Sequence, residues 1–409
     1  MARRDEILAG LDIGTTKVCC VVAEVRDNEL EVIGVGSAPS RGLSRGVVVN
    51  IENTVEAIKH ALYEVETMSG VKVESVYAGI AGSHIKGFNS TGLIAVKNGE
   101  VRDVDIQRVV EAARAVPLPA DREIVHILPQ DFIVDDQDNV RDPLGMSAVR
   151  LEAKVHMVTG LASSVQNIMK SCHRSGLHVS DIVLTQIASA ESVLTPDEKE
   201  LGVALFDIGG GTCDIAIYVN GAIRHTAVVP IAGTHITKDV AQGMRTPLQE
   251  AEKVKLQHGC ARALMVGDDE MIEVSGVGGR PPRRVERRTL AQIIEPRVDE
   301  LFTLIDSELI RSGFKNLLAA GVVITGGTAS LPGIADLAEQ ILDLPARVGE
   351  PAGVGGLVDM VHDPRFATPI GLVLYGSKYR NFGARNRASG DGFFSRISRG
   401  MKETFAEFF

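Results

Sequence analysis

The chain has 409 residues, of which 44% are apolar and 23% charged, as expected for a folded protein of about two to four domains. Its formal net charge of −10 argues against a general nucleic-acid binder, because such a protein needs a basic surface. No stretch approaches the length of a membrane-spanning helix, and no apolar segment follows the basic N-terminus as in a secretion signal. The five cysteines form no C-x-x-C pair, so buried thiols are expected rather than disulfides or a zinc site.

Strands and helices alternate from residue 6 to residue 376, which predicts an α/β protein. Two apolar strands at 7–11 and 18–25 flank a turn that contains Asp12 and the residues Gly-Thr-Thr. A capping pattern that starts at Asn53 predicts a helix that ends at Gly70. Glycines in such a turn let backbone N–H groups approach phosphate oxygens, and threonine hydroxyls add further donors.

The first turn has an approximate second copy. The sequence LDIGTT at 11–16 is echoed by FDIGGGT at 206–212, and each copy follows one apolar strand and precedes another. Two such hairpins facing each other could hold a polyphosphate, with Asp12 and Asp207 on a hydrated Mg²⁺ rather than on the phosphate itself. A single copy would be explained equally well by an ordinary turn, since Asp and Gly favour turns.

Two further features fit a nucleotide. The strand at 322–325 runs into Gly326 and Gly327, where a flat base or an α-phosphate could approach the backbone. Glu252 and Lys255 are spaced i, i+3 on a predicted helix and could bind a ribose. The spacing alone favours an ordinary surface ion pair for these two residues.

The order of these elements resembles the actin/Hsp70/hexokinase superfamily, with connecting helices expected at 186–193 and 367–376. Within it, the chain is similar to FtsA, a family of bacterial cell-division actins. The residues that carry this resemblance are the stretches 87–92, 126–129, 134–135, 142–146, 252–260 and 288–297 and the C-terminal end.

The resemblance implies an actin-like ATPase fold of two duplicated core domains with inserted subdomains 1C and 2B around an ATP site. The implied boundaries are 1–82, 162–196 and 361–376 for 1A, 83–161 for 1C, 197–229 and 301–360 for 2A, and 230–300 for 2B. A flexible linker at 377–392 and an amphipathic membrane-targeting helix at 393–409 would follow.

The resemblance also assigns roles at the site. Asp12, Asp207 and Asp214 would hold Mg²⁺ through water, while Gly326 and Gly327 would adjoin the adenosine, and Glu252 and Lys255 the ribose. Gln186 lies where Hsp70-like relatives carry a carboxylate that orients the attacking water; an amide cannot act as a base, so tight ATP binding and slow hydrolysis are expected. The residues expected at the phosphates are Gly14, Thr15, Thr16, Lys17, Gly209, Gly210, Gly211 and Thr212.

The C-terminal end is rich in phenylalanine and follows the polar segment 377–392. Its apolar residues recur at steps of three and four, as on one face of a helix. This helix could dock on the protein's own core, but the polar segment and the basic residues favour the interface of an anionic bilayer. One copy would bind weakly and a polymer firmly. The residues expected in the membrane are Phe393, Phe394, Ile397, Met401, Phe405 and Phe408.

The tract from Arg280 to Arg288 is the densest basic stretch of the body, and a solvated loop would explain it. The resemblance implies instead that subdomain 2B binds the C-terminal tail of the tubulin-like protein FtsZ, with Arg288 and Arg297 as the chosen contacts. It further implies filament formation, recruitment of later division proteins through 1C, and a place on the cytoplasmic face of the inner membrane at the division site. A small-molecule kinase of the same superfamily and a pilus-assembly actin homologue remain the alternatives.

Overall fold

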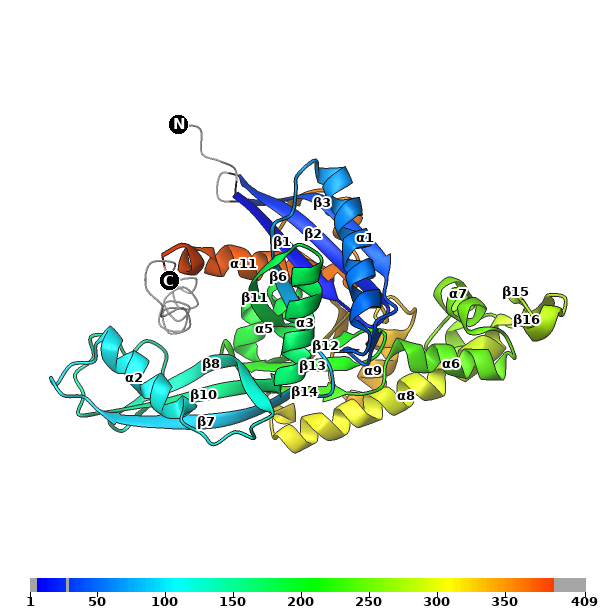
Figure 1. The fold of residues 1–409 in the computed structure, drawn as a ribbon. Helices are drawn as coiled ribbons and strands as arrows, with labels where there is room; N and C mark the ends of the chain where they lie inside the picture. Colours follow the sequence, from blue (N-terminus) through cyan, green and yellow to red (C-terminus); the bar gives the residue numbers. More distant parts are fainter. Residues whose placement is uncertain (1–5, 27–28, 386–409) are drawn as a thin grey trace.

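Two β-sheets built on the same plan form the body of the protein. The computed structural model describes residues 6–26 and 29–385 (Figure 1). The sheet orders are β11-β6-β1-β2-β3-β19 and β14-β13-β12-β17-β18. In each sheet an antiparallel hairpin is extended by a third antiparallel strand on one side and a parallel strand on the other. The repeat seen in the sequence is therefore a repeat of structure.

The first sheet consists of β1 (Glu6–Ile13), β2 (Lys17–Arg26), β3 (Glu29–Pro39), β6 (Ser75–Ile80), β11 (His178–Leu184) and β19 (Gly355–Gly356). The second sheet consists of β12 (Val203–Ile208), β13 (Cys213–Val219), β14 (Ala222–Val229), β17 (Val322–Thr325) and β18 (Ala346–Val348). A two-stranded ribbon, β4 (Leu43–Ser44) and β5 (Val47–Val48), precedes the first helix.

Helix α1 (Ile51–Ser69) covers the first sheet, and its start differs from the prediction. The N-cap is Asn50, whose side-chain oxygen accepts a hydrogen bond from the backbone N–H of Asn53 at 3.0 Å. The predicted cap was therefore three residues late, because Asn53 supplies the bonded N–H rather than the capping oxygen. Gly70 ends the helix as predicted, with φ at +70°.

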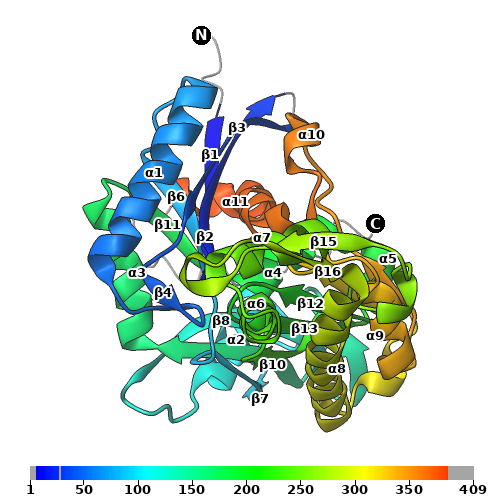
Figure 2. The same ribbon diagram turned by 90° about the vertical axis from the view of Figure 1, so that its right-hand side faces the viewer.

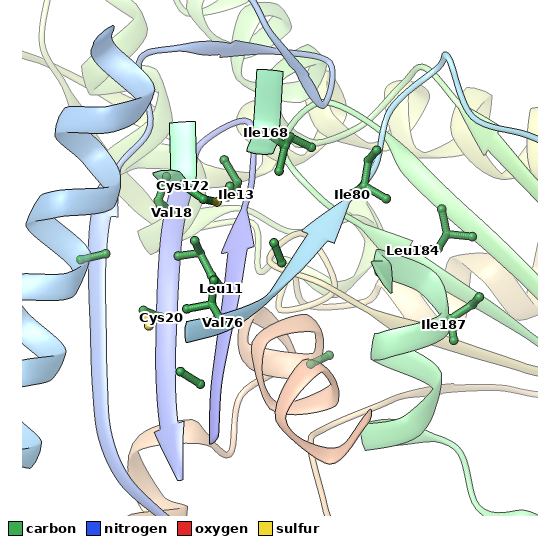
Figure 3. Packing of buried hydrophobic residues seen from close by; sticks show 14 of the residues in the cluster. Leu11, Ile13, Val18, Cys20, Val76, Ile80, Ile168, Cys172, Leu184 and Ile187 are labelled. Atoms are coloured by element: carbon green, nitrogen blue, oxygen red, sulfur yellow. The ribbon is translucent and has the colours of Figure 1, made fainter. Parts of the chain in front are cut away.

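The core of the first domain lies between this sheet and the helices α1, α3 (Ala162–Arg174) and α4 (Thr185–Val193). Side chains of β1, β2 and β6 point toward the same apolar region as Ile168, Cys172 and Ile187 (Figure 3). Helix α11 (Ala367–Arg385) packs on the other side of β1 and against α4. All five cysteines are buried free thiols, as predicted.

A four-stranded antiparallel sheet with one helix is inserted after β6 and lies at one end of the molecule (Figure 1). It contacts the second body sheet through β14, where Arg224 donates two largely buried hydrogen bonds to Asp131, at 2.7 and 2.8 Å. This insert consists of β7 (Lys86–Ala95), α2 (Asp103–Arg114), β8 (Arg122–Val134), β9 (Gln137–Val140) and β10 (Arg150–Leu161).

A second inserted region, called the excursion below, follows β14 of the second body sheet and extends toward the opposite end of the molecule (Figures 1 and 2). It consists of α6 (Gly233–Gly243), α7 (Leu248–His258), β15 (Met271–Val274), β16 (Arg283–Glu286) and the start of α8 (Arg287–Ser312). The remaining helices are α5 (Pro196–Leu201), α9 (Ile334–Leu342) and α10 (Val358–Val361).

The segment expected to be a flexible linker from residue 377 is helical as far as Arg385, as part of α11. Two contacts explain the difference: Lys378 forms an ion pair with Glu191 at 2.7 Å, and the ring of Tyr379 lies 4.4 Å from that of Tyr375. The membrane-targeting helix expected at 393–409 lies outside the described residues. Across 6–26 and 29–385, no helix has the length and apolar character needed to cross a membrane.

Candidate functional site

The turns of the two hairpins touch each other. A Cβ placed on Gly210 would lie 2.3 Å from Cγ2 of Thr16, and one placed on Gly211 would lie 2.6 Å from Oγ1 of Thr15. Both distances are shorter than carbon contacts allow, so only glycine permits this approach. The β1–β2 turn and the β12–β13 turn, which the sequence places 195 residues apart, therefore meet as predicted from the repeat.

Three carboxylates of the two hairpins gather beside this contact. Burial, together with the neighbouring Asp207, raises the pKa of Asp214 to about 8. Asp12 retains some solvent exposure, but the surrounding protein raises its pKa to about 7. The nearby Lys17 opposes this rise. Burial also raises the pKa of Asp207. Carboxyl groups that ionise this reluctantly gain most from a nearby cation.

The donor set fits a hydrated Mg²⁺. Oδ1 of Asp214 is buried without a hydrogen-bond partner, which leaves an oxygen for a water or a metal ion. In the part of the chain that the structure describes, no three His, Cys, Asp or Glu side chains are close enough to ligate one ion directly. Such an ion would need water or phosphate oxygens to complete its shell, which Mg²⁺ commonly uses.

Asp207 is held by two hydroxyl groups that sequence reasoning did not select. Ser189 and Thr368 both donate to Oδ2 of Asp207, at 2.6 and 2.9 Å. They lie on α4 and α11, the two helices that the sequence identified only as connecting segments. These helices pack closely, since a Cβ on Gly371 would lie 1.7 Å from the carbonyl oxygen of Ala188. Each connecting segment carries a hydroxyl residue, and this was the sequence signal that could have identified Ser189 and Thr368.

Gln186 begins the same connecting helix and is fully buried. Its Oε1 accepts a hydrogen bond from the hydroxyl of Thr185 at 3.4 Å, while Nε2 is without a partner. A buried amide nitrogen in this state costs free energy unless a water or ligand accepts its hydrogens. Nε2 is thus a donor that a bound water could satisfy, and the water-orienting role that the resemblance implies stays a prediction.

The glycine pair after β17 adjoins the second hairpin. Gly326 has φ at +86°, and a Cβ there would lie 2.4 Å from Oδ1 of Asp207. Gly327 is exposed, and within 4 Å its added Cβ would meet only the Cβ of Arg365, at 3.9 Å. The hydroxyl of Thr328 donates to the carbonyl of Gly209 at 2.9 Å. The pair thus offers an open backbone face beside the buried carboxylates.

Glu252 and Lys255 form the ion pair that their spacing favours, at 2.8 Å. The ammonium of Lys255 also donates to Oγ1 of Thr237 at 3.0 Å and to the carbonyl of Gly233 at 3.3 Å. Gly233 in turn donates to the carbonyl of Gly209 at 3.1 Å. The pair therefore lies next to the second turn, and its predicted contact with a ribose stays a prediction.

The phosphate-binding candidates differ in what they already bind. Lys17 donates to the carbonyl of Arg365 at 2.7 Å and lies 4.5 Å from the centre of the Phe366 ring. The hydroxyl of Thr15 accepts the N–H of Gly46 at 2.9 Å, and that of Thr212 donates to Asp214 at 3.1 Å. The remaining candidate, Gly14, closes the first turn by donating to the carbonyl of Lys17 at 3.0 Å.

The two arginines selected for a protein partner lie on α8, in the excursion and not at the hairpins. Arg297 binds Asp239 through two contacts, at 2.5 and 3.1 Å. Arg288 donates to the carbonyl of Val266 at 2.9 Å and forms an ion pair with Asp268. Both guanidinium groups therefore already have internal acceptors.

Family models and curated proteins both relate this chain to cell-division proteins. A family model described as "Cell division protein FtsA" matches residues 204–371, and one described as "SHS2 domain inserted in FTSA" matches 82–159. Cell division protein FtsA of Pseudomonas aeruginosa is 52% identical over 391 residues, 95% of this chain and 94% of that protein. The Escherichia coli K12 protein of the same name is 40% identical over 413 residues and 98% of each chain.

Solved structures with low sequence identity share the architecture. The PilM–PilN type IV pilus biogenesis complex has a TM-score of 0.67 at 17% identity and covers 90% of this chain and 98% of that chain. MreB5 of Spiroplasma citri has a TM-score of 0.56 at 14% identity and covers 95% of this chain and 99% of that one. These similarities confirm the expected actin-like fold with an inserted subdomain. Because its relatives are this similar over nearly their whole length, the chain belongs to the FtsA family of cell-division proteins.

Proposed function

We propose that the chain binds Mg-ATP between the β1–β2 and β12–β13 turns and serves as a membrane-anchored actin of the cell-division machinery. The observation that carries the nucleotide proposal is the contact of Thr15 and Thr16 with Gly210 and Gly211, beside three carboxylates. Structures of MreB5 from Spiroplasma citri with ADP and with AMPPNP support a nucleotide in this fold.

In this proposal the threonine hydroxyls and the backbone N–H groups of both turns bind the phosphates. Asp12, Asp207 and Asp214 bind the Mg²⁺ through water, and the ion supplies charge that neutralises both the carboxylates and the phosphates. Gly326 and Gly327 adjoin the adenosine, with Glu252 and Lys255 at its ribose. Closing the two hairpins on one ligand would couple the two domains.

Gln186 orients a water without taking its proton, because an amide is not a base at neutral pH. We expect tight Mg-ATP binding with turnover below about 1 s⁻¹, which is slow for an enzyme. Calorimetric titration with Mg-ATP and a phosphate-release assay measure the two quantities. Turnover well above that rate would favour the small-molecule kinase alternative, which needs an efficient catalytic base.

The membrane proposal rests on the sequence of residues 393–409. Burying each large apolar side chain contributes about 1.5–3 kcal/mol, against an ordering cost of about 1–2 kcal/mol per helical residue. One copy therefore anchors weakly, and linkage of many copies in a filament raises the effective concentration. Polymerisation would thereby make the anchor firm.

Co-sedimentation with anionic liposomes, with and without Mg-ATP, tests this anchor. The full chain is expected to pellet and a chain truncated at Asp391 is not. A matched pair refines the test: Phe405→Glu places a charge on the apolar face, whereas Ala406→Glu adds the same charge outside it. Equal pelleting of the full and truncated chains would contradict the proposal.

We also propose that the excursion around α8 binds the acidic tail of FtsZ and that the insert recruits later division proteins. Because Asp239 and Asp268 already bind Arg297 and Arg288, a peptide carboxylate must compete with them or bind the exposed Arg284 nearby. Fluorescence anisotropy with a tail peptide measures the affinity. Reversing the charge at Arg288 and Arg297 is expected to weaken it; unchanged affinity would reject these contacts.

A further inference from the structure

The short helix η4 (Pro364–Phe366) connects the two halves of the proposed nucleotide site. The ammonium of Lys17, from the first hairpin, donates to the carbonyl of Arg365 at 2.7 Å. On the other side, the backbone N–H of Gly326 donates to the carbonyl of Pro364 at 3.2 Å. One turn of chain thus contacts both the phosphate hairpin and the glycine pair.

The side chain of Arg365 lies at the open face of the glycine pair. Its Cβ is the one atom within 4 Å of a Cβ added to Gly327, at 3.9 Å, so a ligand on that backbone face would adjoin it. More than half of the side chain, 57%, is exposed. Its guanidinium can therefore move to meet a ligand without breaking a buried contact.

Two cations converge on one aromatic ring at this place. The ammonium of Lys17 lies 4.5 Å and the guanidinium carbon of Arg365 lies 5.3 Å from the centre of the Phe366 ring. The carboxylate of Asp363 forms an ion pair with Arg365 at 3.2 Å. A phosphate bound beside this ring would be an acceptor that both cations can share.

We propose that Arg365 is a phosphate-binding residue of the nucleotide site. Its guanidinium binds the α-phosphate of a nucleoside polyphosphate that lies between Gly327 and the first turn, next to Lys17. The guanidinium fork suits this role because it can donate two parallel hydrogen bonds to one phosphate. This inference rests on the proposed nucleotide binding and adds a contact that neither hairpin contains.

Titration with ATP, AMP and adenosine tests the proposal, using displacement of a fluorescent ATP analogue where affinities are low. Arg365→Ala is expected to weaken ATP and AMP binding by about tenfold or more, the usual value of a charged hydrogen bond, and to leave adenosine binding unchanged. Arg365→Lys should recover part of the loss. Arg174→Ala removes an exposed arginine at the end of α3 and should behave as the unaltered protein.

The outcomes separate the inference from the function on which it rests. If the unaltered protein binds ATP but Arg365→Ala changes ATP and AMP affinity by less than about twofold, the inference alone is wrong. An equal loss for adenosine would also overturn it, since only a structural role of Arg365 predicts that result. If the unaltered protein binds no nucleotide, both the function and the inference are wrong. A weaker salt dependence of ATP affinity in Arg365→Ala would support the lost phosphate contact.

Discussion

The two hairpins have the same strand pairing, yet the protein supports them differently. In the second hairpin, Asp207 accepts hydroxyl hydrogen bonds from two helices, and the carbonyls of Gly209 and Gly210 accept further bonds from Gly233, Thr234 and Thr328. In the described part of the chain, Asp12 of the first hairpin has no such hydroxyl donors. The ammonium of the nearby Lys17 contacts a backbone carbonyl and the face of a ring, so it can leave these partners for a ligand.

The difference indicates that the two hairpins contribute to ligand binding in different ways. Hydrogen bonds already hold the second hairpin in place, so in the proposed site it would receive a metal ion with little rearrangement, which reduces the cost of binding. The first hairpin keeps groups that can turn toward a ligand. We therefore expect substitutions at the second hairpin to be more damaging than matched substitutions at the first.

The largest effect is expected for Asp207→Ala compared with Asp12→Ala. Removing Asp207 deletes a carboxylate of the proposed metal site and the acceptor that two buried hydroxyls, Ser189 and Thr368, share. Mg-ATP affinity is expected to fall by about 100-fold or more, and the loss for Asp12→Ala to be smaller. Calorimetry on both variants measures this. Equal losses would refute the proposed asymmetry between the hairpins.

The next effect concerns the contact between the turns. In Gly210→Ala the new methyl would lie 2.3 Å from Cγ2 of Thr16 and push the hairpins apart, so Mg-ATP affinity should fall by about tenfold. Gly209→Ala is the matched control, because its methyl would meet nothing closer than the carbonyl of Thr212 at 3.4 Å. Adding Thr16→Ser to Gly210→Ala removes the clashing methyl and should restore part of the affinity. If Gly209→Ala and Gly210→Ala behave alike, turn contact is not what limits binding.

A smaller effect is expected at the hydroxyls behind Asp207. Ser189→Ala removes one of two donors to a buried carboxylate, which should lower Mg-ATP affinity by a factor equivalent to about 1.5–3 kcal/mol. Thr368→Ser keeps its hydroxyl and should stay close to the unaltered protein. Titration of both variants, with urea unfolding as a check on stability, gives the comparison. A loss in Thr368→Ser as large as that in Ser189→Ala would mean that packing, not hydrogen bonding, supports Asp207.

The repeat made both hairpins predictable from sequence, because each copy carries its Asp, Gly and Thr in one short run. Ser189 and Thr368 could not be found in this way, since their role depends on two helices that cross far from the turns in sequence. The same holds for Arg365, which reaches the site only because its loop folds back on Lys17. Local patterns also misplaced the cap of α1 and ended α11 too early, where Lys378 and Tyr379 make tertiary contacts.

The smallest effect tests whether the insert braces the second hairpin. His156 of the insert lies 2.8 Å from Oγ1 of Thr226 on β14, the strand that pairs with β13 of that hairpin, and 2.7 Å from Oδ1 of Asn89. Burial, together with the nearby His225, lowers the pKa of His156 from 6.5 to about 3. At a pH between these two pKa values, His156 carries a proton in the unfolded chain but not in the folded protein.

The contribution of His156 to stability is therefore complete above pH 6.5 and decreases as the pH falls toward 3. At pH 5 about 2 kcal/mol of it should be lost. Urea unfolding at pH 7 and pH 5 should show that His156→Gln loses less stability on acidification than the unaltered protein. His60→Gln, at an exposed position on α1, should change nothing. An unaltered pH slope in His156→Gln would mean that this histidine is protonated without cost, and the insert would then not brace the second hairpin through a neutral, buried ring.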